Sequence, residues 1–173
     1  MSAFTSTDLT EQVADTVIAD LERGLRFFEG IFRQKRFTDK DIINGVFLGA
    51  ATRIAGKAAI RVVIDGKESG WHATRVRDDH YKFNIDVLAK VTAKKEEIES
   101  FINTFAGAVH NYLIRFDNLQ PKIIGTNVQA YNAWADNYTK GYSEGGAYRV
   151  ARIPYYITIM NPYMGHSVSQ SSC

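Results

Sequence analysis

The sequence predicts an α+β fold in one domain over residues 1–162, with a mainly antiparallel sheet of about five strands packed against two main helices. Two adjoining stretches carry this prediction. Residues 80–91 alternate apolar and polar side chains, the period of a strand with one buried and one exposed face. Residues 98–116 repeat apolar side chains every three or four positions, the period of an amphipathic helix. A half-exposed strand followed directly by a helix is typical of a two-layer α+β domain.

The first helix is predicted over residues 9–33. Asp8 is a suitable N-cap, with Glu11 at the capping-box position. The apolar stripe that would dock this helix is Val13, Val17, Leu21, Leu25, Phe28 and Phe32.

Two alternatives stay open for residues 34–57. Asp39 can cap a short helix through Ile42, Val46 and Leu48, whereas several glycines in the segment favour an extended arm. The pattern does not decide between helix and arm.

A three-stranded antiparallel meander is predicted next. Residues 59–65 form its first strand, and Asp65-Gly66 is a strong hairpin signal that would start a return strand over residues 70–77. Asp78-Asp79 would then turn the chain into the strand 80–91. In that strand Asp86 falls on the exposed face, and Leu88 is the only apolar residue there.

The C-terminal third is predicted as two further strands, over residues 122–130 and 147–160. Between them, residues 131–146 are polar, aromatic and glycine-bearing, which favours a long hairpin loop or a projecting arm. Arg149 and Arg152 should lie on opposite faces of the last strand. Pro154 should mark an edge or a bulge. Residues 163–173 are expected to form a flexible tail.

Composition limits the function classes. A 173-residue chain that is 45% hydrophobic and 23% charged is typical of a globular protein rather than a disordered one. A net charge of +2 argues against nucleic acid or acidic membrane as the main partner. No run is apolar enough to span a bilayer, and the N-terminus lacks signal-peptide features. The lone Cys173 cannot form an internal disulfide.

No catalytic constellation is evident, so we expect a protein that is not an enzyme and has no metal site or cofactor. The four histidines lack zinc-ligand spacing, and the glycines form no nucleotide-binding pattern. A different class of function is a single-strand nucleic-acid platform. It would combine a basic stripe with nearby aromatic rings. The residues proposed for it are Arg75, Arg77, Lys82, Arg149, Trp71, Tyr81 and Tyr148.

The aromatic residues of the 131–146 region are the feature that the rest of the pattern explains least. Large rings on an adaptable loop favour a protein–protein interface, although they could instead cover one end of the core. The candidate interface residues are Tyr131, Trp134, Tyr138, Tyr142, Tyr148, Arg149, Trp71 and Arg75. Replacing Trp134 or Tyr138 by alanine should impair assembly more than folding.

The order of elements resembles that of the tail terminator, or tail completion, proteins of long-tailed bacteriophages. The resemblance covers residues 58–160 and includes a strand of the type Y-x-F-x-I-D-V directly before the long helix. In this chain the matching residues are Tyr81, Phe83, Ile85, Asp86 and Val87.

The resemblance implies a structural virion protein that assembles in the host cytoplasm and resides in the tail or neck. Family members form a ring, typically a hexamer, that ends the tail tube and docks the head connector. The implied partners are further copies of the chain, the tail tube protein, head connector or neck proteins, and a sheath protein in a contractile tail. DNA would pass only as cargo. A neck, stopper or tail-tube-like protein is the alternative within this class.

Overall fold

The computed structural model describes residues 9–34, 43–49, 57–73, 76–91, 94–115, 123–124 and 128–161. In these residues the chain forms an α+β fold, as predicted. The two helices are α1 (Thr10–Gln34) and α2 (Lys95–Leu113). The strands are β1 (Ile43–Leu48), β2 (Ala58–Ala73), β3 (Val76–Lys90), β4 (Ile123–Ile124), β5 (Val128–Ala135), β6 (Thr139–Tyr142) and β7 (Tyr148–Asn161).

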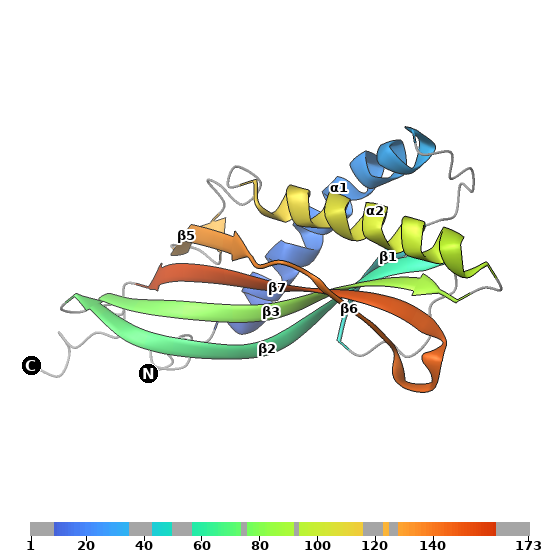
Figure 1. Cartoon of the computed structure of the whole chain (residues 1–173). Coiled ribbons are helices and arrows are strands. Elements are labelled where there is room, and N and C mark those ends of the chain that lie inside the picture. Colours follow the sequence, from blue (N-terminus) through green and yellow to red (C-terminus); the bar gives the residue numbers. More distant parts are fainter. Residues whose placement is uncertain are drawn as a thin grey trace, which may run out of the picture.

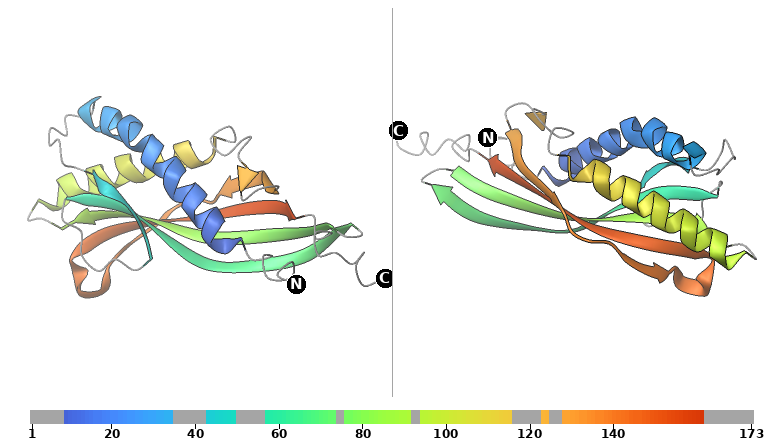
Figure 2. Two further views of the ribbon diagram at one scale, coloured as in Figure 1. Left: turned by 180° about the vertical axis from the view of Figure 1, so that it is seen from behind. Right: turned by 45° about the horizontal axis from the view of Figure 1, so that its top comes forward.

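The described strands form a seven-stranded sheet in the order β1-β2-β3-β7-β5-β4, with β6 also paired to β7. All pairings are antiparallel except that of β1 with β2. Both helices pack on one face of the twisted sheet (Figures 1 and 2). We call the opposite face the open face. The hairpin of β2 and β3 and the hairpin of β6 and β7 point to opposite ends of the molecule (Figure 1).

The core lies between the helices and one face of the sheet, where the two predicted apolar stripes meet. Phe83 and Ile85 of β3, Phe105 of α2 and Leu21 and Phe28 of α1 are all fully buried there. The strand alternation and both helical stripes are therefore confirmed over the described residues. Burial of such large apolar side chains stabilises a fold by roughly 1.5–3 kcal/mol each before entropy costs.

The predicted turn at Asp65-Gly66 is wrong, because β2 continues through it. The structure has one long hairpin of β2 and β3 where three strands were predicted. The register shifts between Ile64 and Gly66, so the extra residue is absorbed as a bulge, and Gly66 lacks the positive φ of a tight hairpin turn. Asp79, which was assigned to a turn, is buried within β3 and accepts a hydrogen bond from Ser69 Oγ at 2.7 Å. Pairing along the whole hairpin outweighs the local turn preference.

Between residues 34 and 57 the described part is a strand, so the helical alternative is wrong over Ile43–Leu48. Gly45 has a φ of 130° and Gly49 a φ of 82°, and neither value is compatible with an α-helix. The other residues of the interval, apart from Gln34 at the end of α1 and Gly49 and Lys57 beside the strands, lie outside the described residues. The tail over residues 163–173 lies outside them as well.

Candidate protein–protein interface

The 131–146 segment is mostly strand rather than the predicted loop, because β5 and β6 follow each other along the outer side of β7. β5 pairs with Tyr155 through Met160, and β6 pairs with Arg149 through Arg152. Pro154 lies opposite the interruption between them and accepts a hydrogen bond from the Asp136 amide at 2.9 Å. In an antiparallel ladder the N–H and C=O of one residue point to the same side. Pro154 has no N–H to donate there, which explains why the outer strand breaks at residues 136–138.

Trp134 is the most prominent aromatic side chain of the open face. It lies opposite Tyr156 in the register of β5 and β7, and 59% of it is exposed. Its indole Nε1–H donates to Asp136 Oδ1 at 2.9 Å, which fixes the ring beside a carboxylate. A large exposed ring held in one orientation loses little entropy on binding, as is typical of interface anchors.

Lys82 lies next to this ring pair on the open face. Its ammonium group is 2.9 Å from Asp65 Oδ2 and 5.9 Å from the centre of the Tyr156 ring. The hydrogen bond to Asp65 raises the pKa of Lys82. The ammonium charge is therefore already paired within the chain.

Tyr142 lies at the tip of the β6–β7 hairpin and is 62% exposed. The guanidinium of Arg149 is 4.5 Å from the centre of its ring and donates to the Gly141 carbonyl at 2.8 Å. Arg149 thereby holds the tip in shape and presents the ring to solvent.

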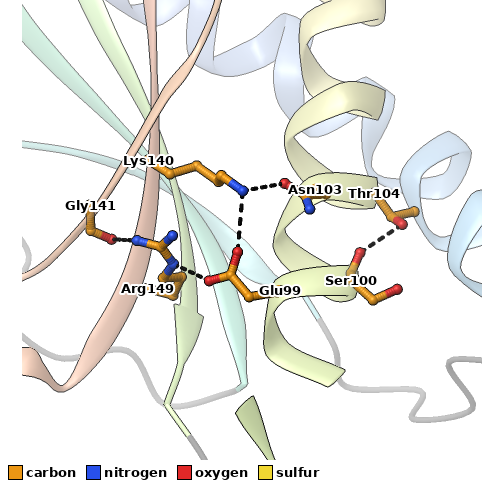
Figure 3. A network of polar contacts seen from close by, with 7 residues as sticks. All are labelled: Glu99, Ser100, Asn103, Thr104, Lys140, Gly141 and Arg149. Atoms are coloured by element: carbon orange, nitrogen blue, oxygen red, sulfur yellow. Dashed lines mark hydrogen bonds and ion pairs between the residues drawn. The ribbon is translucent and has the colours of Figure 1, made fainter. Parts of the chain in front are cut away.

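Glu99 of α2 ties this hairpin to the helix (Figure 3). Arg149 Nε donates to Glu99 Oε1 at 2.5 Å, and Lys140 Nζ lies 3.2 Å from Glu99 Oε2 and 2.9 Å from Asn103 Oδ1. The hydrogen bond from Arg149, followed by that from Lys140, lowers the pKa of the Glu99 carboxyl group. The predicted opposite orientations of Arg149 and Arg152 are confirmed, because Arg149 binds Glu99 on the helix-covered face and Arg152 faces Asp86 on the open face.

A row of charges crosses the centre of the open face, where the alternation predicted an exposed Asp86. Asp86 is fully buried and lies opposite Arg61 on β2 and Arg152 on β7. Arg61 Nη2 is 2.6 Å and Arg152 Nη2 is 2.9 Å from Asp86 Oδ2. Asp86 raises the pKa of Arg152 through the hydrogen bond. The sequence carries no signal for this row, since it depends on the register of three strands.

Leu88, the apparent exception on the polar side of β3, belongs to a small apolar cluster on the open face. Ala59 and Val150 are buried with it, and Phe47 and Tyr148 pack against them. Tyr148 is therefore half-buried.

Tyr138 is also half-buried, because it packs against the main core, where its ring lies edge-on to the His110 ring with 6.4 Å between the two ring centres.

The structure thus gathers only part of the predicted interface set. Trp134 and Tyr142 are exposed, Tyr138 and Tyr148 are half-buried, and Arg149 is bound to Glu99. Of the remaining candidates, Tyr131 and Trp71 lie in strands but their side chains are outside the described set, as is the whole of Arg75.

The structure does not bring together the described residues of the proposed nucleic-acid platform. Tyr81 is buried under the helices, Arg149 binds Glu99 on the helix-covered face, and Lys82 lies on the open face.

Within the described ranges, no three His, Cys, Asp or Glu side chains cluster in a way that could hold a metal ion. Neither of the two described helices is long and apolar enough to cross a membrane.

No protein-family model matches the sequence, and no curated protein matches it. Among solved structures, the chain is similar to one from the virion of the native gene transfer agent (GTA) particle. That chain is 11% identical, the match covers 76% of this chain and 92% of the other, and the TM-score is 0.49. A second solved chain, which bears no descriptive name, is 12% identical over 84% of this chain and 94% of its own, with a TM-score of 0.38.

Proposed function

We propose that this protein is a non-enzymatic virion assembly protein, a tail terminator that forms a ring on the head-proximal end of a phage tail tube. In this role the ring stops tube polymerisation and docks the head connector. The proposal rests on the Y-x-F-x-I-D-V strand that leads into α2, together with one structural observation. Within the described residues the sheet offers two different edges that are uncovered over part of their length, and one of them carries exposed aromatic anchors.

The first edge is the outer side of β6 and of β5 after Gln129, where β4 no longer pairs with β5 in the described part of the chain. Within the described residues β6 pairs only with β7, and all four of its residues are exposed. Trp134 and Tyr142 stand on either side of the break on this edge.

The second edge is on the opposite side of the sheet. In the described chain β1 covers β2 only over residues 58–62, so the outer side of β2 beyond Val62 has no strand beside it there. Unpaired strand edges readily accept another chain. Two unlike edges on one subunit are what a head-to-tail ring requires, because each interface joins two different patches.

The mass of the purified protein under native conditions, combined with negative-stain images, tests this proposal. A closed ring, of six subunits in the implied case, is the expected result with or without purified tail tube. A protein that stays monomeric both alone and with tail tube would refute it.

The choice of partner separates the terminator from a neck or stopper protein. A terminator should co-sediment with tail tubes that lack it, whereas a neck protein should bind the head connector and leave tube ends free. Trp134→Ala and Tyr142→Ala should reduce tube binding, and Glu96→Gln, which alters an exposed residue on α2, serves as the matched control.

A further inference from the structure

Trp134, Asp136 and Tyr156 form one surface on the open face, which we call the tryptophan edge. Trp134 and Tyr156 are neighbours across β5 and β7, and the indole N–H holds the Asp136 carboxylate beside the ring. The exposed indole and the exposed carboxylate are therefore fixed next to each other before any partner binds.

The charge of this surface is unbalanced. Lys82 pairs directly with Asp65 and interacts with Asp136 only through longer-range electrostatics. The side-chain hydrogen bond of Asp136, within the described part of the chain, goes to the neutral indole, so two carboxylates share one ammonium group at this surface. An aromatic face beside a carboxylate whose charge is only partly compensated attracts a cation.

A guanidinium group fits this surface better than an ammonium group. Its flat face can stack on the indole of Trp134 while its edge N–H groups donate to Asp136. The ammonium group of a lysine is a compact, strongly hydrated charge and cannot make both contacts in this way.

We propose that the tryptophan edge binds an arginine side chain presented by a partner protein. This inference deepens the proposed function and rests on it only for the identity of the partner as a virion protein. The partner is taken as a different protein because five of the six arginines whose side chains the structure describes are already engaged, with Arg26 as the exception. These five contact a carboxylate or a ring, namely Arg23, Arg61, Arg115, Arg149 and Arg152.

A titration with short peptides tests the proposal directly on the full-length protein. The probes are acetyl-Gly-Arg-Gly-amide, the lysine analogue and the glutamate analogue. The readout is the indole N–H resonance of Trp134, which a Trp71→Phe variant assigns because the chain has only two tryptophans. The arginine peptide should shift this resonance in a saturable way at millimolar concentration, the lysine peptide less, and the glutamate peptide not at all.

Asp136→Asn is the matched variant, since an amide oxygen can keep the bond to the indole while the charge is lost. It should weaken arginine binding by about two- to fivefold, the range for an exposed ion pair. Glu96→Gln, which removes an exposed charge elsewhere, should leave binding unchanged. An unmoved Trp134 resonance, equal shifts with the arginine and lysine peptides, or unchanged binding to Asp136→Asn would each overturn the proposal.

Two further outcomes are informative. Self-association of the protein alone that Asp136→Asn abolishes would identify a second copy as the occupant, which also overturns the partner-protein proposal. Ring formation without arginine binding would reject the tryptophan edge as a docking site while leaving the terminator function standing.

Discussion

Asp86 and Glu99 are both carboxylates held between two basic side chains, but they lie on opposite faces of the sheet. Asp86 is fully buried between Arg61 and Arg152 at the centre of three strands. The side chain of Glu99 is 39% exposed and joins a helix to a projecting hairpin. Solvent weakens an exposed ion pair, whereas removing one partner of a buried pair leaves an uncompensated charge. The same kind of ion pair therefore stabilises the fold at Asp86 and orients the β6–β7 hairpin at Glu99.

The largest effect should come from a buried charge without partners. Ile85→Asp places a carboxylate among the apolar side chains under the helices, one residue away from the well-compensated Asp86. We expect loss of the folded state, a cost of about 4 kcal/mol or more. Circular dichroism and limited proteolysis would measure it, with Ile85→Val as the control. A folded Ile85→Asp protein would show that this face tolerates charge.

Removal of the Asp86 charge should have the next largest effect. In Asp86→Asn, Arg61 and Arg152 lose their counter-ion while the side-chain shape is kept. We expect a loss of about 2–4 kcal/mol, because Asp86 and most of Arg61 are buried although Arg152 is half-exposed. Urea unfolding measures the change. A loss no larger than that of Asp65→Asn, which breaks an exposed pair, would contradict the contrast between buried and exposed ion pairs.

Alanine substitutions at Tyr138 and Trp134 should have different effects on folding stability, although the sequence predicted that both would mainly impair assembly. Tyr138→Ala should lower the free energy of unfolding by about 1–3 kcal/mol, since its ring packs on the core. Trp134→Ala should change it by no more than about 0.5 kcal/mol while weakening assembly. Thermal unfolding and native mass measurements on both variants decide this. Equal destabilisation would show that the Trp134 ring is also part of the packed structure.

The smallest effect on global stability should come from Glu99. Its pKa is lowered in the folded protein, so its contribution is present at neutral pH and is lost as the pH falls through the folded pKa. Amides of β6 should therefore exchange with solvent faster at a pH below 4.5, the ordinary pKa of glutamate, than at neutral pH, after correction for intrinsic rates. Glu99→Gln should show the faster exchange at both pH values. If neither the lower pH nor Glu99→Gln speeds up exchange, the β6–β7 hairpin is held in place without the contribution of Glu99.

The periodic parts of the fold could be predicted from the sequence, because burial imposes the period directly. The stripe of α1, the stripe of α2 and the alternation of β3 all follow from that rule. The hairpin turn predicted at Asp65-Gly66 was wrong because the turn preference of this dipeptide is local, while the pairing of β2 with β3 is long-range. The charge row at Asp86 depends on which strands become neighbours, and periodicity does not carry that information. Trp134 and Asp136 are only two positions apart, and their contact was missed because residues 131–146 were predicted as a loop.

The missing N–H of Pro154 also limits how the chain can aggregate. Without the break, β5 and β6 would form one straight outer strand, a long template on which copies could add without limit. The break leaves two short templates with a bend between them, and a partner must match that bend to bind both. Such an edge admits a shaped partner and rejects an ordinary strand, which suits the proposed role of ending a polymer.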